Sequence, residues 1–124
     1  MLKKRLIFSL LYDQGSFMLS RNFKLQRVGD LSWIRENYDF NAIAKSIDEL
    51  VVLNVSRGEK NIYEFHEALI ELSKNCFSPL AAGGGIRNIN DAHKILNSGA
   101  DKLILNSHFF LNKNLVETIS KTFG

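Results

Sequence analysis

The sequence predicts an α/β fold in which four parallel strands alternate with helices. Three continuous apolar runs, and a shorter fourth that ends in glycines, are typical of strands covered on both faces. The segments between them carry apolar residues at helical spacing, and this alternation of strands and helices favours a parallel sheet with right-handed crossovers. We expect the strands at about residues 5–11, 49–54, 79–83 and 102–106.

Three helices are predicted from stripes of apolar residues and from capping residues at their ends. The first follows the second strand. The next has Asn88 or Asn90 as its N-cap and ends at Gly99, and the last begins at Asn112 or Asn114. The three stripes are formed by Ile62, Phe65, Leu69 and Leu72, by Ile89, Ala92 and Leu96, and by Leu115, Val116, Ile119 and Phe123.

Two stretches near the amino terminus are less regular. Residues 13–28 are predicted to form one long connection that begins with a tight turn at Asp13-Gln14-Gly15. A connection of that length in a compact domain is usually functional or mobile. The segment from Asp30 to Ser46 is expected to be helical, with Asp39 able to cap a second start that breaks it.

Length and composition favour one globular domain over residues 1–124. The chain is 45% hydrophobic and 23% charged, and its net charge of +3 comes from scattered basic residues, so neither nucleic acid nor an anionic membrane is implied as a partner. A single Cys76 cannot form an internal disulfide, and no apolar run approaches the roughly 20 residues of a membrane span, so a cytoplasmic location is expected. The three histidines do not repeat at metal-ligand spacing; we predict no metal and no cofactor, and expect them to be exposed or to cap helices.

A run of three glycines stands between a predicted strand and a predicted helix. In Gly83-Gly84-Gly85, unhindered backbone N–H groups and the helix N-terminus can converge on a phosphate. The alternative is a tight turn that needs glycine only for positive φ. Asn106 and Ser107 follow the next strand and should lie beside this loop, because the carboxyl ends of parallel strands form one binding face. The alternative for this pair is that one of them caps the following helix.

As a set, these residues resemble the cyclase subunit of imidazole glycerol phosphate synthase. The resemblance spans all 124 residues and is carried by Gly83-Gly84-Gly85-Ile86-Arg87, Gly99-Ala100-Asp101-Lys102, Asn106-Ser107 and Asp48-Glu49-Leu50. That family forms an eight-stranded TIM barrel from two similar halves, so the resemblance implies that this chain is a (β/α)4 half-barrel. It also implies a phosphorylated substrate, held here by Gly84, Gly85, Asn106 and Ser107, and a glutaminase partner that supplies ammonia.

The resemblance assigns charged residues to the opposite ends of the strands. Arg5, Glu49 and Lys102 match three of the four residues that ring the family's ammonia entrance. Each stands at the start of a predicted strand, so the three can meet around the barrel axis. The alternative is ordinary surface salt bridging, which contributes little to stability. Asp48 and Asp101 lie nearby and would face the glutaminase.

The chain departs from the family at positions that move protons. Leu11 stands where the family has a catalytic Asp at the end of the first strand, and Leu19 where it has a loop Lys. Asn54 replaces the Asp that closes the second strand; it can form hydrogen bonds but cannot act as a general base, so we expect no histidine-pathway cyclisation and keep Asn54 as a weak catalytic candidate. The departures fit a divergent branch of cyclase-like barrels, which support acetamidino modification of surface sugars together with a glutaminase.

A half-barrel alone exposes two sheet edges and an apolar inner face. We therefore expect a homodimer that closes a pseudo-barrel, aggregation, or a missing second half, with a compact doubly wound sheet as the competing architecture. Two functions stay open. One is a cyclase-type lyase component of a glutamine amidotransferase system; the other is a noncatalytic phosphate-binding half-barrel or a truncated fragment of a histidine-biosynthesis cyclase.

Overall fold

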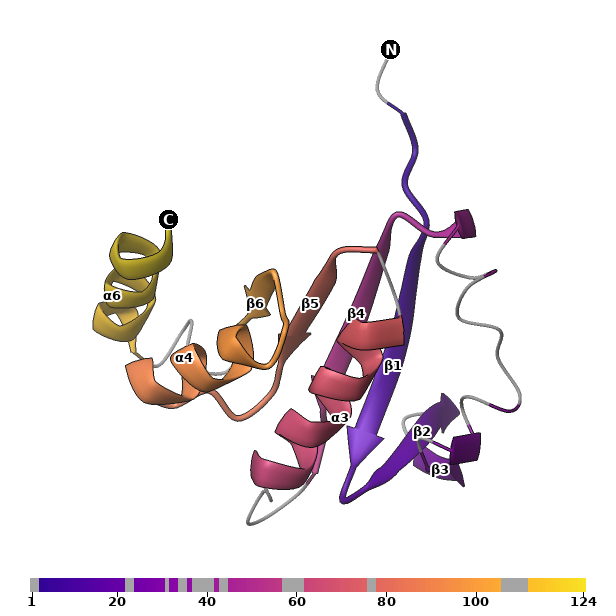
Figure 1. Ribbon diagram of the computed structural model, residues 1–124. Helices are drawn as coiled ribbons and strands as arrows, with labels where there is room; N and C mark the ends of the chain where they lie inside the picture. Colours follow the sequence, from indigo (N-terminus) through magenta and orange to yellow (C-terminus); the bar gives the residue numbers. More distant parts are fainter. Residues whose placement is uncertain are drawn as a thin grey trace.

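A computed structural model describes residues 3–21, 24–30, 32–33, 36, 42, 45–56, 62–75, 78–105 and 112–124. In this part of the chain, one six-stranded sheet has the strand order β3-β2-β1-β4-β5-β6 (Figure 1). The strands are β1 (Ile7–Asp13), β2 (Ser16–Arg21), β3 (Lys24–Gly29), β4 (Glu49–Asn54), β5 (Leu80–Gly83) and β6 (Lys102–Ile104). The longer helices are α3 (Ile62–Asn75), α4 (Ile89–Asn97) and α6 (Lys113–Phe123).

The predicted parallel sheet is confirmed. β1, β4, β5 and β6 are parallel neighbours in that order, and a helix follows each of the last three strands along the chain. β4 has the predicted bounds, whereas β1 begins and ends two residues later than predicted. This arrangement is that of a (β/α)4 half of a TIM barrel.

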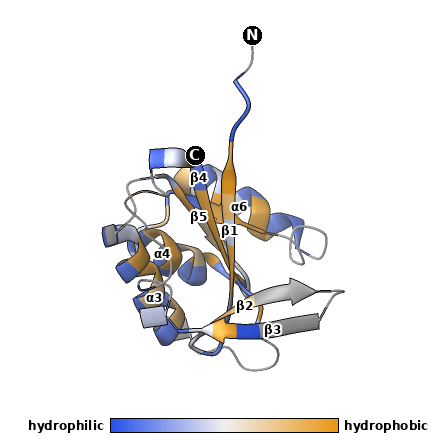
Figure 2. Ribbon diagram, turned by 90° about the vertical axis from the view of Figure 1, so that its right-hand side faces the viewer, coloured by the Kyte–Doolittle hydropathy of each residue, from blue (hydrophilic) through white to orange (hydrophobic). Residues whose placement is uncertain are grey.

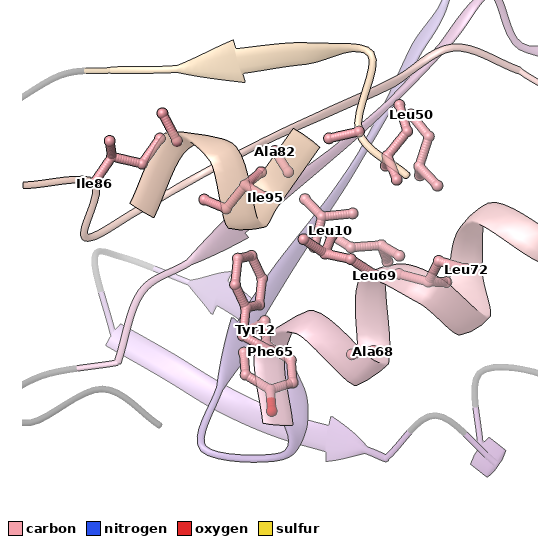
Figure 3. Packing of buried hydrophobic residues seen from close by; sticks show 14 of the residues in the cluster. Leu10, Tyr12, Leu50, Phe65, Ala68, Leu69, Leu72, Ala82, Ile86 and Ile95 are labelled. Atoms are coloured by element: carbon pink, nitrogen blue, oxygen red, sulfur yellow. The ribbon is translucent and has the colours of Figure 1, made fainter. Parts of the chain in front are cut away.

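The hydrophobic core lies between the parallel strands and the helices (Figure 3). Side chains alternate across a strand, so Leu10 and Tyr12 of β1 and Leu50 of β4 share the face that meets Leu69 and Leu72 of α3. Leu50 and Leu69 are fully buried. Burial of one such leucine contributes about 1.5–3 kcal/mol to folding.

The other face of the parallel strands carries the alternate residues. Ile7 and Ser9 of β1 are exposed there, and Val51 and Leu53 of β4 are half-buried. Figure 2 shows that β1, β4 and β5 are hydrophobic along most of their length, whereas the coloured segment that leads into β1 is mostly hydrophilic. In a closed barrel this face lines the interior.

An antiparallel hairpin replaces most of the long connection predicted over residues 13–28, so that prediction was wrong. β1 runs on to Asp13 and turns back through Gln14 and Gly15, whose φ angles of 45° and 85° match the two-residue turn typical of hairpins. β2 then pairs with β1, and β3 pairs with β2. The rings of Tyr12 and Phe17 pack edge to face across this turn, with their centroids 5.8 Å apart. The predicted tight turn itself is confirmed.

The capping residues of the helices settle the alternatives left by the sequence. Asn88 Oδ1 accepts a hydrogen bond from Asp91 N–H at 2.9 Å, and Asn112 Oδ1 accepts one from Leu115 N–H at 3.1 Å. Gly99 follows α4 with a φ of 108°, as expected for a helix stop.

The segment predicted to be helical between Asp30 and Ser46 is described only in part. Asp30 Oδ1 accepts a hydrogen bond from Trp33 N–H at 2.9 Å, which is an N-cap interaction. Ser46 Oγ donates to the carbonyl of Ala42 at 3.1 Å, one helical turn earlier. Asp39 lies outside the described residues.

Candidate functional site

The glycine loop lies at the carboxyl end of β5, beside the ends of β4 and β6. Gly84 and Gly85 have φ angles of 100° and 79°, which favour glycine. A Cβ atom built on Gly84 would lie 2.2 Å from the carbonyl oxygen of Asn54, and one on Gly83 would lie 2.2 Å from that of Ile104. Close packing against the neighbouring strands therefore requires glycine at Gly83 and Gly84, whether or not the loop binds an anion.

The beginning of α4 is capped by its own side chains. Besides the bond from Asp91 N–H to Asn88, the Asp91 carboxylate accepts a hydrogen bond from Arg87 N–H at 3.0 Å. Two N–H groups at this terminus are thus already bonded. An anion that approaches here would not find these two N–H groups free.

A shallow depression opens between the glycine loop and the first turns of α3 and α4. Its lining residues are Asn54, Phe65, His66, Gly84, Gly85, Arg87, Asp91 and Ile95. Burial is the main factor that lowers the pKa of the His66 imidazole; the charge of Lys94 lowers it further, and Asp91 partly opposes both. Nothing in the helical pattern of the sequence indicates that His66 faces the glycine loop, so His66 was not predicted as a site residue.

Asn54 ties the end of β4 to the β1–β2 turn. Its Oδ1 accepts a hydrogen bond from Ser56 N–H at 3.1 Å, and Ser56 Oγ accepts one from Gln14 N–H at 3.1 Å. Both Asn54 and Ser56 are buried. The amide oxygen of Asn54, a catalytic candidate, thus forms a hydrogen bond within the segment that follows β4. Leu11 lies in the sheet between Leu53 of β4 and Met18 of β2, where it offers no group for proton transfer.

A second depression lies between the β1–β2 turn and α3, and its rim is acidic. It is lined by Tyr12, Gly15, Phe17, Asp30, Ser32, Glu64, Glu67, Ala68 and Glu71. Burial, followed by the charge of Glu64, raises the pKa of the Tyr12 hydroxyl, so this group is protonated at neutral pH.

Charged residues gather at the amino ends of the strands. Lys102 Nζ and Glu49 Oε1 form an ion pair at 3.3 Å, although β5 separates their strands. The Glu49 side chain is 14% exposed and that of Lys102 is 56% exposed. Arg5 is exposed and lies two residues before β1, at the same edge of the sheet.

Asp48 and Asp101 are bonded within the chain at this edge. Asp48 Oδ2 accepts a hydrogen bond from Leu6 N–H at 2.7 Å, and Asp101 Oδ2 accepts one from Leu80 N–H at 2.8 Å. Each aspartate directly precedes a strand, β4 or β6, and bonds the chain at the start of a neighbouring strand. Their predicted contact with a partner stays a prediction.

Some predicted site residues lie outside the described residues. These are Asn106 and Ser107. Within the part that the structure describes, no group of three or more His, Cys, Asp or Glu side chains is arranged to hold a metal ion. No helix there combines the length and the apolar character needed to cross a membrane.

Comparison with known proteins identifies the family. The family model described as "Histidine biosynthesis protein" matches residues 29–124. The chain belongs to this family. Its members are TIM barrels, which agrees with the parallel sheet and its crossover helices.

Curated relatives of this histidine-biosynthesis-family chain match it from end to end. A protein of Parasynechococcus marenigrum (strain WH8102), "Putative imidazole glycerol phosphate synthase subunit hisF2", is 49% identical over 124 residues, which cover 100% of this chain and 46% of the relative. A Campylobacter jejuni protein of the same name is 34% identical over 125 residues, which cover 100% of the chain and 48% of that relative. "Imidazole glycerol phosphate synthase subunit HisF" of Clostridium botulinum (strain Kyoto / Type A2) is 35% identical with the same coverage. The chain thus spans about half the length of the curated relatives it matches.

Proposed function

We propose that this chain acts as the first half of an imidazole glycerol phosphate synthase cyclase-like barrel. In this proposal its carboxyl edge binds a phosphate group of the substrate, and its amino edge admits ammonia from a glutaminase partner. The names of the relatives, which match the chain over its whole length, support this assignment. The observation that carries it is the strand order at the carboxyl edge.

β5 and β6 are hydrogen-bonded neighbours, with Gly83 in register with Ile104. Gly84 and Gly85 directly follow β5, and Asn106 and Ser107 come two and three residues after the end of β6. Two loops that leave adjacent parallel strands begin at the same edge of the sheet, so both can contribute to one phosphate site. The loop N–H groups would bind the phosphate oxygens, and the Asn106 amide and Ser107 hydroxyl would add side-chain hydrogen bonds.

A titration tests the phosphate site. We expect Ser107→Ala to weaken binding of a ribose phosphate about tenfold, since one hydrogen bond to a charged group contributes about 1.5–3 kcal/mol. Gly85→Ala keeps its N–H group, but its φ of 79° is one that alanine rarely adopts, so we expect it to weaken binding by displacing the loop. Binding is measured by calorimetry or by amide shifts. Ser120→Ala, on the exposed face of α6, is the control and should bind as the wild type does. Equal affinity in all variants would refute the site.

At the amino edge, we propose that Arg5, Glu49 and Lys102 ring an entrance for ammonia. The ion pair between Glu49 and Lys102 supports this role, because it closes the gap over β5 and can open when a partner docks. Asp48 and Asp101 lie at the same edge and would be near that partner.

The chemistry carried out by the completed barrel is proposed to differ from histidine-pathway cyclisation. Leu11 lies within β1 and Asn54 ends β4, at the two positions where the resemblance implies a carboxylate, and neither side chain can act as a general base. This favours the divergent branch that supports acetamidino modification of surface sugars.

The second candidate is a noncatalytic phosphate-binding half-barrel or a truncated fragment of a histidine-biosynthesis cyclase. When a second half-barrel is supplied, ammonia-dependent turnover of the histidine-pathway substrate should be absent while phosphate binding persists; substantial turnover would contradict the divergent assignment.

Completion of the barrel requires a second half, supplied by a further part of the same protein, by another copy of this chain or by another protein. Within the described residues, Leu11–Asp13 of β1 pair with β2, and Ile7–Tyr12 pair with β4. Leu6 and Ile7 are more than half exposed at the amino edge of the sheet. Exposed apolar side chains at this edge are a surface against which a second half can pack.

A further inference from the structure

Two aspartates at the amino edge of the sheet make the same pair of hydrogen bonds with a neighbouring strand. Asp48 N–H donates to the Leu6 carbonyl at 2.8 Å, and Asp48 Oδ2 accepts from Leu6 N–H at 2.7 Å. Asp101 N–H donates to the Leu80 carbonyl at 2.7 Å, and Asp101 Oδ2 accepts from Leu80 N–H at 2.8 Å. We call these two arrangements the Asp48 clamp and the Asp101 clamp. One structural device therefore occurs twice in the chain.

Each clamp is adjacent in sequence to charged residues at the proposed entrance. Asp101 directly precedes Lys102. Asp48 directly precedes Glu49, and its partner Leu6 directly follows Arg5. The two clamps therefore act on different strand pairs: the Asp101 clamp joins β6 to β5, and the Asp48 clamp joins β4 to β1.

The contact between Lys102 and Glu49 depends on strand offsets. Their side chains meet at 3.3 Å across β5, so β6 must be held at the correct position along β5. β6 has only three residues, and a slip of one residue would turn Lys102 to the other face of the sheet. The Asp101 clamp adds two hydrogen bonds directly beside Lys102, one of them to a carboxylate and therefore strengthened by charge.

We propose that Asp101 is a positioning residue for the Glu49–Lys102 ion pair and that Asp48 plays the equivalent role for Arg5 beside β4. The inference deepens the proposed function, because these charges are the ones proposed to ring the ammonia entrance. Because the inference concerns the Glu49–Lys102 ion pair, it can be tested without measuring ammonia transfer. The two clamps provide a matched comparison, since each aspartate makes the same bonds in a different strand pair.

The experiment measures how strongly the Lys102 ammonium group affects the Glu49 carboxylate. In the isotope-labelled 124-residue chain, Lys102→Met is expected to shift the side-chain carboxyl ¹³C resonance of Glu49. In an Asp101→Ala background this shift should fall at least about threefold, because a double-mutant cycle reports the coupling of the two side chains. In an Asp48→Ala background the shift should stay as in the wild type. Asp101→Asn retains an oxygen acceptor for Leu80 N–H and should restore the shift.

Amide exchange verifies each clamp separately. Asp101→Ala should accelerate exchange at Leu80, and Asp48→Ala should accelerate it at Leu6. If Asp101→Ala does not fold, Asp101→Glu displaces the carboxylate by one methylene and serves in its place. The proposal would be overturned if Lys102→Met shifted the Glu49 resonance as much in the Asp101→Ala background as in the wild type. It would also be overturned if this shift fell equally in the Asp101→Ala and Asp48→Ala backgrounds. Because no step uses ammonia or phosphate, failure of the proposed function would leave the result of this experiment unchanged.

Discussion

Gly84 is enclosed by the backbone of the neighbouring strand. Its positive φ and the nearby Asn54 carbonyl both oppose a side chain at this position. Gly124 also has a positive φ, of 87°, but a Cβ there would meet no heavy atom within 4 Å. A side chain at Gly124 would therefore meet backbone strain alone, whereas one at Gly84 would meet the same strain and a steric clash.

We expect Gly84→Ala to lower the free energy of unfolding by more than about 2 kcal/mol, because strain at positive φ costs about 1–3 kcal/mol before the clash is added. Urea unfolding followed by circular dichroism measures this loss. Gly124→Ala is the control and should lower stability less, since a Cβ there would meet no heavy atom within 4 Å and no clash is added to the backbone strain. Equal effects at the two positions would show that Gly84 is not confined as described.

His66 should make stability depend on pH. Burial and the charge of Lys94 lower its pKa, so the folded chain binds fewer protons than the unfolded chain. The resulting stabilisation is present above the ordinary histidine pKa of about 6.5 and is lost as the pH falls through the lowered pKa. We expect His66→Gln to flatten the fall in unfolding free energy between about pH 7 and pH 5. Lys94→Gln should move the His66 pKa back toward its ordinary value in an NMR titration; no movement would refute the assigned cause.

Among the elements, the β1–β2 turn places a glutamine where asparagine is preferred. Gln14 has a φ of 45° and precedes Gly15, and asparagine followed by glycine is the favoured pair for two-residue hairpin turns. A left-handed conformation costs most L residues roughly 1–2 kcal/mol, and asparagine adopts it more readily.

We therefore expect Gln14→Asn to stabilise the chain by about 0.5 kcal/mol, a fraction of that left-handed penalty. The bond from residue 14 N–H to Ser56 Oγ uses the backbone and is retained. Thermal unfolding of Gln14→Asn and of Gln14→Val gives the comparison. A β-branched residue at positive φ should destabilise the hairpin, so an unchanged midpoint in both variants would contradict the turn geometry.

The parallel strands were predictable because each is an apolar run that ends at polar residues or, for β5, at glycines. β4 is the clearest case, since Glu49 and Asn54 mark both of its limits in the sequence. The hairpin was missed because Arg21 and Lys24 interrupt its pattern with charge, while the pairing that stabilises it is with β1 and is not visible in local sequence.

The candidate site was predictable in part. The position of the glycine loop follows from strand order, and the meeting of Glu49 with Lys102 was expected from the resemblance at strand starts. Nothing in the sequence indicates that Asp48 bonds to Leu6 or that Asp101 bonds to Leu80. Those contacts arise only when the strands are placed in register. The position of His66 beside the glycine loop was likewise missed, since it depends on how α3 packs against α4.

At the scale of the whole molecule, Leu6 and Ile7 at the amino edge of the sheet are apolar and more than half exposed. We expect the isolated chain to associate at micromolar concentration, because exposed apolar side chains favour contact between copies. Light scattering on a size-exclusion column measures the mass, and twice the monomer mass is expected.

Ile7→Lys is the variant that tests this edge. Ile7 is 51% exposed, so a lysine there should disturb the fold little while it opposes association. Tyr63→Lys is the control, because Tyr63 is 77% exposed on α3, away from the edge. A stable monomer for the wild-type chain would refute association through β1.

The small side chain of Ala81 has a further effect at the amino edge. Ala81 pairs with Val51 on one side and with Lys102 on the other, so it lies on the same face as Glu49, in the strand that the lysine side chain must cross. A methyl group leaves room for that reach, whereas an isoleucine or phenylalanine would occupy it. We therefore expect a larger side chain at position 81 to keep the two opposite charges on either side of β5 apart.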